Sequence, residues 1–411
     1  MNSLFMLLPE KLQGLILRKL IKVDLPKNKY KKVIYKVAET LDEKEQAYRL
    51  VRNSYLKTNI EVLNNSDINL NKYFLLPSTT TFIAVYEGEV IGTVSQVLDV
   101  GLGLPIDDFT DIKDIRDSNA RVCELTSLAI HERWRGGHRI FFPLVFFAVY
   151  YCYKNIGIDS IVSVTDLKGG IIMRQLFGFE KLSTDATYFH KAKSKKSTAQ
   201  ILNLHKLKNY FKTHFKSPNI TRNLYQLYFK SPWFDQWDVP EKLYPLACER
   251  IFSVEEFNYF FKEKSNMYYL LNQIEKRVLE NQIYREREVF RVQTEEINTR
   301  QYDRFIVNMR GSLTRDGDDI EVKVLDLAQY GMQIYLGDNE AQFFQIDDDI
   351  KGYLKLNDKS TLNFFAKVQW IHLNRIGVRF VYSDKEKLDD FLRYANDYSY
   401  ERCKLLDNKA S

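Results

Sequence analysis

Apolar and polar side chains alternate in several short runs near the C-terminal end of this 411-residue chain. The runs are Ile320–Asp326, Met332–Leu336, Asn363–Trp370 and Ile371–Phe380. Such alternation is typical of strands with one buried face. An α-helix, with about 3.6 residues per turn, would not gather these apolar side chains on a single face. Asn374 stands where the last two runs would turn, and about Asp384–Tyr398 has helical spacing. We therefore expect a β-rich unit followed by a terminal helix.

Two arginines precede this unit in an extended approach to it. Arg300 and Arg304 stand four residues apart, and a second short motif with Asp326, Ala328 and Gly331 follows about twenty residues later. A guanidinium group binds phosphate through paired hydrogen bonds and also stacks on bases. Together the two motifs predict a site for a phosphorylated small molecule that carries guanine.

These residues fit the RxxxR and (D/N)x(S/A)xxG motifs, so the segment from about Arg285 to Ser383 resembles the PilZ domain. The resemblance implies an all-β barrel that binds cyclic di-GMP. Ala328 stands where Ser is commoner, and Thr299 replaces the extra Arg of members that bind an intercalated nucleotide dimer, which leaves the stoichiometry open. The implied binding residues are Arg300, Arg304, Asp326, Ala328 and Gly331. The alternative is a barrel whose site binds nothing.

The preceding region, from about residue 30 to 195, alternates expected strands with expected helices. The strands are Tyr30–Thr40, Thr81–Tyr86, Val90–Val97, Arg121–Ile130, Ser160–Thr165 and one that begins at Gly178–Leu182. The helices are about Asp42–Lys57, Ile140–Asn155 and one that ends at Leu176. This order predicts a mixed α/β sheet.

The run Glu124–Ile130 precedes a helix start that bears glycines, and Leu176–Glu180 closes the region. In this order these residues resemble the GNAT acyltransferase superfamily. Backbone N–H groups after Gly136 and Gly137 suit the phosphates of an acyl carrier. Arg133 and Arg135 add positive charge, and His138 stands at the last small position of the usual loop. The resemblance thus implies acyl-donor binding by Arg133, Arg135, Gly136, Gly137 and His138.

Some departures from the usual GNAT pattern favour one branch of the superfamily. Arg174 occupies the position, four before Gly178, that is often the general-acid Tyr. Glu124 begins an E-x-(S/T)-R-like run in which Ser127 replaces the Arg. This run resembles N-acyl amino acid synthases and acyl-homoserine-lactone synthases, which take acyl chains from acyl carrier protein. The resemblance implies that Glu124 is the general base for the attacking amine, through water. The alternative is a Glu that only accepts a backbone hydrogen bond.

Composition restricts the remaining function classes. The net charge of +6, with Arg133, Arg135 and Arg139 near the donor loop, suits an acidic acyl carrier protein; a coenzyme A thioester is the other donor. Neither the cysteines nor the six histidines have metal-ligand spacing, so we expect no metal site and buried thiols in a reducing compartment. The cysteines are Cys123, Cys152, Cys248 and Cys403. Basic residues are dispersed, which makes nucleic-acid binding the least favoured reading.

No apolar run is long enough for a transmembrane helix, and the N-terminal segment lacks the features of a signal peptide. From Pro9 it has helical spacing, with an expected apolar face of Leu12, Leu15, Ile16 and Leu20. We expect a docking helix, with peripheral membrane contact as the alternative. The expected localisation is cytoplasmic, or else membrane-peripheral.

The expected organisation is an N-terminal helix (1–29), a GNAT-like α/β domain (30–196), a helical connector (197–290) and a PilZ barrel with its C-terminal helix (291–411). In the connector, Ser253–Glu256 is a capping box and Asn266–Glu288 is a candidate long helix. The helix Phe141–Tyr151 is aromatic, which fits plain core better than an acyl tunnel.

The sequence supports two functions of different kinds. The first is a cyclic di-GMP-responsive acyltransferase that moves an acyl chain to the amine of an amino acid or a similar acceptor. The second is an inactive GNAT-like scaffold that signals cyclic di-GMP to a protein partner. The acceptor, the acyl length, the direction of the nucleotide's effect and the oligomeric state stay open.

Overall fold

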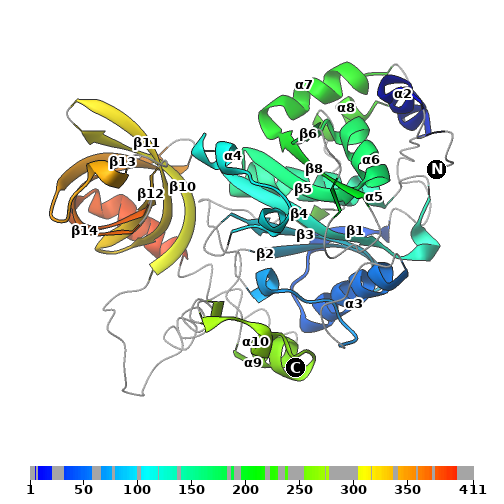
Figure 1. The fold of residues 1–411 in the computed structure, drawn as a ribbon, viewed down its shortest axis with the longest axis horizontal. Coiled ribbons are helices and arrows are strands. Elements are labelled where there is room, and N and C mark those ends of the chain that lie inside the picture. Colours follow the sequence, from blue (N-terminus) through cyan, green and yellow to red (C-terminus); the bar gives the residue numbers. More distant parts are fainter. Residues whose placement is uncertain are drawn as a thin grey trace.

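The computed structural model places a mixed α/β sheet beside a closed β-barrel (Figure 1). The structure describes residues 5, 8–20, 32–57, 66–75, 79–99, 103–118, 120–136, 140–182, 187–188, 196–217, 223–229, 237–238, 254–273, 275–276, 304–315, 317–336, 341–357, 360–372 and 375–395. None of the helices in these ranges is long and apolar enough to cross a membrane.

The sheet has the strand order β6-β8-β5-β4-β3-β2-β1-β9, and β7 pairs with β8. Its strands are β1 (Ile34–Val37), β2 (Thr79–Tyr86), β3 (Glu89–Leu98), β4 (Val122–Ile130), β5 (Ser160–Asp166), β6 (Glu180–Lys181), β7 (Thr187–Tyr188), β8 (Lys196–Asn203) and β9 (Trp237–Asp238). β1 to β4 pair antiparallel, whereas β4 and β5 are parallel. The predicted mixed sheet is confirmed. β2 and β3 are joined through Glu87 and Gly88, both with positive φ, which suits a tight hairpin.

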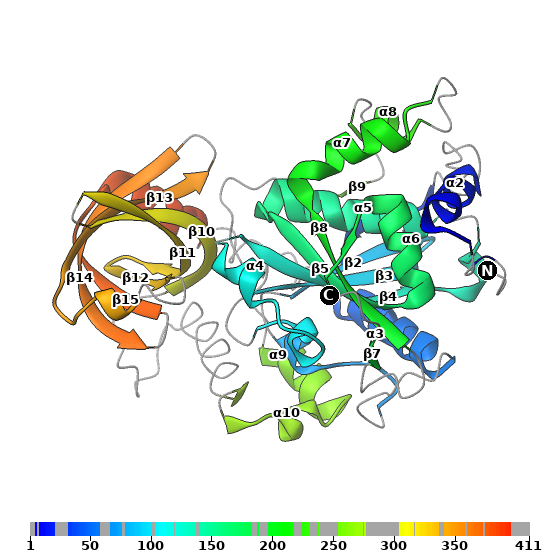
Figure 2. The ribbon, with the colours of Figure 1, turned by 45° about the horizontal axis from the view of Figure 1, so that its top comes forward.

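Helices cover both faces of the sheet (Figures 1 and 2). One face carries α5 (Phe141–Tyr151), α6 (Leu167–Phe177), α7 (Leu204–His214) and α8 (Leu224–Phe229). The other carries α3 (Leu41–Lys57), α9 (Val254–Asn258), the π-turn η8 (Tyr259–Glu263) and α10 (Met267–Leu270). Both faces of the sheet are therefore closed by apolar packing.

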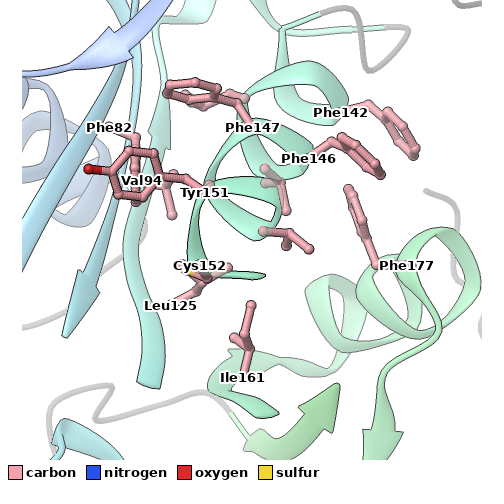
Figure 3. Close-up of a cluster of buried hydrophobic side chains, with 14 of the residues drawn as sticks. Phe82, Val94, Leu125, Phe142, Phe146, Phe147, Tyr151, Cys152, Ile161 and Phe177 are labelled. Carbon is pink, nitrogen blue, oxygen red and sulfur yellow. The ribbon is translucent and has the colours of Figure 1, made fainter. Parts of the chain in front are cut away.

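The aromatic helix α5 lies in the centre of one core (Figure 3). A helix that is apolar all round is stable only when it is buried on all sides. Phe142 stacks on Phe177 of α6 with ring centroids 4.8 Å apart, and Tyr151 meets Phe82 of β2 edge to face at 5.2 Å. The described aromatic side chains of α5 therefore pack as core, as expected.

The sheet continues beyond residue 196, where the helical connector was expected to begin. β8 pairs antiparallel with β5 from Ser160 opposite Asn203 to Asp166 opposite Ser197. Most of its side chains are buried, including the polar Gln200. Small polar residues interrupt its apolar pattern, which is why the sequence did not identify it as a strand.

The expected long helix over Asn266–Glu288 is wrong within the described residues. α10 ends at Leu270, and Leu271 is extended with φ −72° and ψ 141°. Asn272 and Glu275 then exchange hydrogen bonds of 2.9 Å between side chains and backbone, which is a capping box for a new helix start. Residues 277–288 lie outside the described part of the chain.

The N-terminal helix is present as α2 (Glu10–Leu20), but its buried face differs from the expected one. Leu12 and Leu15 are 43% and 53% exposed, whereas Gln13, Gly14 and Leu17 are buried. A Cβ on Gly14 would lie 1.9 Å from Oε1 of Gln175, so the helix approaches α6 through its glycine. Close backbone approach at Gly14 and burial of Leu17 therefore orient α2.

The C-terminal domain is a six-stranded antiparallel barrel with the strand order β10-β11-β12-β15-β14-β13. Its strands are β10 (Arg304–Arg315), β11 (Asp318–Ala328), β12 (Gly331–Tyr335), β13 (Asp349–Asn357), β14 (Ser360–His372) and β15 (Arg375–Ser383). A helix over 385–395 packs Leu388, Phe391 and Ala395 on its core. The four predicted strands are confirmed, as is the terminal helix up to residue 395, beyond which the chain is not described; β10 and β13 complete the closure.

Candidate functional site

Glu124 is a buried carboxylate in the middle of the sheet. It lies on β4, is 2% exposed, and accepts a 2.6 Å hydrogen bond at Oε2 from the backbone N–H of Ile106. Ile106 belongs to the 3-10 turn η3 (Pro105–Asp108). A buried carboxylate needs such donors to offset its lost hydration. The backbone bond orients Glu124 and by itself assigns no chemistry.

The sheet opens at Glu124. β4 pairs with β5 only from Val122 opposite Ser160 to Glu124 opposite Val162. Beyond this point β5 is paired with β8 alone, while β4 continues to Ile130 beside β3. Crevices outside the carboxyl ends of parallel strands are common ligand sites in α/β sheets. Glu124 is thus the last paired residue before the two strands part.

A bulge next to Glu124 brings a tyrosine toward it. The β3–β4 register shifts between Thr93 and Ser95, and Ser127 on β4 has φ 55°. Tyr55 of α3 shares a hydrogen bond with Ser127. Burial raises the pKa of the Tyr55 phenol, the charge of Glu124 raises it further, and the Ser127 bond partly offsets this. The sequence places Tyr55 only on the core face of its helix, and no local motif marks it otherwise.

The predicted donor loop is described in part. Arg135 donates from Nε to the Ile130 carbonyl at 2.8 Å and from Nη2 to Ser54 Oγ at 3.2 Å, so it ties the loop to β4 and α3. Arg133 and Gly136 are exposed, and Gly136 has φ 109° with open space within 4 Å of where a Cβ would lie. Gly137 and His138 lie outside the described residues. Glu132, Arg133, Arg135 and Gly136 are all exposed in this loop before α5.

Arg174 is engaged away from Glu124. It lies on α6, its side chain is 9% exposed, and Nη2 contacts Glu10 of α2 at 2.9 Å. The structure therefore gives Arg174 a part in anchoring the N-terminal helix. Phenols within electrostatic reach of Glu124 belong to Tyr55 and Tyr73 instead.

The barrel motif residues meet at one end of three strands. Arg304 begins β10 opposite Ala328 of β11, and Ala328 lies opposite Gly331 of β12. Asp326 lies two residues before Ala328 on β11, opposite Ile306 of β10 and Gln333 of β12. Arg300 and the side chain of Arg304 lie outside the described part. The backbone ladders thus bring four of the five predicted residues together.

Gly331 is required by the close approach of two strands. A Cβ at this position would lie 2.2 Å from the Val378 carbonyl oxygen of β15. Gly331 also pairs with Arg379, an exposed cation that the motifs do not include. The position of Arg379 beside the motif follows from the β12–β15 ladder and could not be read from the run Ile371–Phe380 alone.

Among the described residues, no group of three or more His, Cys, Asp or Glu is placed to hold a metal ion. Cys123 and Cys152 are buried thiols with their sulfurs 3.8 Å apart. Cys248 and Cys403 lie outside the described residues.

Comparison with known proteins agrees with both parts of the chain. The family model of the N-acyl amino acid synthase FeeM matches residues 46–195, and that of the PilZ domain matches residues 298–397. No curated protein matches the chain.

Solved structures resemble each part. FeeM, an N-acyl amino acid synthase from uncultured soil microbes, is 18% identical over 43% of this chain and 93% of its own, with a TM-score of 0.38. The coenzyme A-dependent acyl-homoserine lactone synthase BjaI is 12% identical over 51% and 95%, with a TM-score of 0.38. The PilZ domain of Escherichia coli YcgR, solved with cyclic di-GMP, is 15% identical over 27% and 99%, with a TM-score of 0.22.

Proposed function

We propose that this chain, which joins an N-acyl amino acid synthase domain to a PilZ domain, is a cyclic di-GMP-responsive N-acyltransferase. One observation carries the catalytic half: Glu124 is buried where β4 and β5 part and is oriented by the Ile106 amide. A buried, oriented carboxylate at the point where two parallel strands part is suited to accept a proton from a reacting group.

The reaction joins an amine to an acyl thioester. The neutral amine nitrogen attacks the thioester carbonyl, the C–N bond forms, and the C–S bond breaks as the thiolate leaves. Glu124 accepts the amine proton through water, and the thiolate takes up a proton to become a thiol. The Tyr55 phenol, which is hydrogen-bonded to Ser127, is protonated at neutral pH as an ordinary Tyr is, and its raised pKa makes ionisation beside Glu124 still less favourable.

The acyl donor is acyl carrier protein or coenzyme A carrying the chain. Arg133 and Gly136 are the described residues of the loop that would meet its phosphate, and Gly137 and His138 complete the proposed set. Arg135 instead holds the loop against β4 and α3. The acceptor is an amino acid or a similar amine.

Cyclic di-GMP is the proposed ligand of the barrel. Arg304, Asp326, Ala328 and Gly331 are adjacent through their ladders, and Arg300 precedes them in the chain. A ligand shifts an enzyme between two states only when its affinity for them differs. The proposed regulation by cyclic di-GMP therefore requires the barrel and the acyltransferase domain to be coupled.

The test is turnover of acyl carrier protein and acyl-coenzyme A donors with an amino acid panel, followed by mass spectrometry of the products. Replacing a general base costs about 10²- to 10⁴-fold in rate, so we expect this loss in Glu124→Gln. Glu132→Gln is the matched control, because Glu132 is an exposed carboxylate on the donor loop paired with Lys57. Equal rates in the two variants would refute the catalytic role of Glu124.

One observation favours the inactive scaffold as a second candidate. Arg174 stands at the usual general-acid position and is held by Glu10. Cyclic di-GMP binding without product from any donor would support this reading over the enzyme.

A further inference from the structure

A row of polar side chains crosses the outer surface of the barrel. Arg310 of β10 lies opposite Lys323 of β11, and Lys323 lies opposite Tyr335 of β12. Lys323 is only 6% exposed although it lies on the outside of the barrel core. The row is covered because the acyltransferase domain lies against it, beside α4 (Lys113–Asp117) (Figures 1 and 2).

The acyltransferase domain presents carboxylates to this row. Arg310 forms an ion pair with Asp159, which lies just before β5. Lys323 is within electrostatic reach of Asp99 and Asp159 but also of the cations Arg116 and Arg121, and Tyr335 is within reach of Asp99, Asp117 and Arg116. Arg310 thus meets a charge of opposite sign in Asp159, whereas Lys323 faces charges of both signs.

Asp159 ties the barrel to the starts of both parallel strands. Its Oδ2 accepts a 2.8 Å hydrogen bond from the backbone N–H of Arg121, just before β4. Its Oδ1 lies 2.9 Å from Nε2 of His205 at the start of α7, and Arg310 adds the contact from the barrel. The barrel thus holds the sheet at the base of the β4–β5 pair.

Arg116 of α4 connects the same surface to Glu124. Its guanidinium makes two hydrogen bonds to Asp99, of 2.8 and 2.9 Å, and two to Asp107, of 2.9 and 2.8 Å. Such forked pairs fix orientation as well as distance. Asp107 in turn accepts a 2.8 Å bond from the Leu104 amide and so shapes the turn η3. Ile106, which lies two residues after Leu104 in this turn, donates its backbone N–H to Glu124.

The nucleotide motif and the docking row lie on the same three strands. Arg304, Ala328 and Gly331 form one row, and Arg310, Lys323 and Tyr335 form the other. At about 3.3 Å per residue, the rows are about 13–20 Å apart along the strands. Both ladders shift register between the rows, at Ile306/Met309 and at Val324/Asp326. Bulges bend and twist strands locally, so this is where the rows can move relative to each other.

We propose that the Arg310–Lys323–Tyr335 row is the docking face through which the barrel holds the acyltransferase domain, and that Arg116 is a positioning residue that links docking to Glu124. The link to catalysis rests on the proposed acyltransferase function, whereas the docking face does not.

Lys323 makes the docked arrangement reversible. Desolvation lowers its pKa, and among the described residues it forms no ion pair. Burial of a charge that has no ion-pair partner is costly, so docking is weaker than the Arg310–Asp159 ion pair alone would make it. Removal of this charge should strengthen docking, whereas removal of the Arg310 charge should weaken it.

The first experiment measures the radius of gyration of the full chain by small-angle X-ray scattering, with and without cyclic di-GMP. We expect Arg310→Ala to expand the protein and Lys323→Met to keep it compact under both conditions. Lys351→Ala removes an exposed cation from β13 and is the control. The docking face is refuted if Arg310→Ala and Lys351→Ala have the same dimensions as the unmodified chain.

The second experiment measures amide hydrogen exchange of the Leu104–Phe109 segment. In Arg116→Ala and in Arg310→Ala we expect the Ile106 amide to exchange at least about tenfold faster, which is about 1.4 kcal/mol of lost protection. Arg116→Lys keeps the charge without the fork and should exchange at an intermediate rate. Unchanged exchange in Arg116→Ala would overturn the link to Glu124.

Kinetics separate positioning from a merely structural role. We expect Arg116→Ala to lower kcat while the KM for the acyl donor and the melting temperature stay close to those of the unmodified chain. A lower kcat that is accompanied by a changed KM and a lower melting temperature would overturn the positioning role of Arg116. If the unmodified chain transfers no acyl group, the proposed function fails, and scattering and exchange still decide the docking face and its link to η3.

Discussion

The two domains place their charged groups differently. The mixed-sheet domain buries Glu124 at 2% exposure and the Lys44–Glu256 ion pair at 5% and 1%. The described apolar core of the barrel encloses no charge: its buried Lys323 lies on the outer face against the other domain, and its motif residues lie at the strand ends. A reacting carboxylate benefits from exclusion of water, whereas a nucleotide receptor must stay accessible. Substitution of a charge should therefore affect stability in the first domain and binding in the second.

The largest expected effect tests the buried ion pair that joins α3 to α9. Glu256→Ala leaves Lys44 buried without its partner, and loss of one partner costs about 3–5 kcal/mol. Urea unfolding followed by circular dichroism measures this loss. Glu263→Ala, which removes an exposed carboxylate from the neighbouring turn, should cost little. Equal losses would show that burial does not distinguish these charges.

The next effect tests the barrel side of the comparison. Arg304→Ala should weaken cyclic di-GMP binding by roughly 10- to 100-fold, as expected for loss of a charge-assisted hydrogen-bond pair worth about 1.5–3 kcal/mol. Isothermal titration calorimetry gives the Kd, and urea unfolding should be almost unchanged. Arg393→Ala, on the exposed side of the C-terminal helix, is the control. An unchanged Kd in Arg304→Ala would remove this residue from the nucleotide site.

A smaller effect separates backbone from side-chain requirements in the barrel. Gly331→Ala forces a methyl group against the Val378 carbonyl, and overpacking of this kind costs about 1–3 kcal/mol. The melting temperature should fall, and cyclic di-GMP binding should fall with it. Gln329→Ala, at an exposed position in the same turn, should change neither. A fully stable Gly331→Ala protein would contradict the close β12–β15 approach.

The smallest effect concerns pH. Burial opposes ionisation of Asp159, but Arg121, His205 and Arg310 outweigh it and lower the pKa of this carboxyl. Its stabilising contribution is therefore complete above the ordinary Asp pKa of about 3.9 and is lost as the pH falls through the lowered value. Scattering should show a docked barrel from neutral pH down to about pH 4, and release only below it. In Asp159→Asn this acid transition should disappear, and its persistence would assign it to other groups.

Local patterns predicted the parts of the fold that local forces determine. β4, β11 and α3 follow from alternation or helical spacing within a single run of sequence. β8 was missed because its place depends on pairing with β5, and its own residues have no consistent period. α10 stops where Asn272 and Glu275 begin a new cap, which a continuous apolar stripe had hidden.

The candidate site residues also divide into those that local sequence predicts and those that only the folded chain brings together. The motif residues of the barrel were predictable because fixed spacings on two adjacent strands bring them together. The Ile106 amide that holds Glu124 was not, because it comes from a loop without a pattern. The Arg310–Asp159 contact joins residues far apart in the chain and appears only once both domains are folded.

β8 also determines where this protein can be divided. It lies between β5 and β6 in the sheet, yet it follows the region that matches the synthase family. A polypeptide that ended at residue 195 would leave β5 with a full row of unpaired amides and carbonyls. Open edges of this kind pair with other chains and lead to aggregation. The mixed-sheet domain must therefore extend at least through Asn203 to keep this edge of β5 paired.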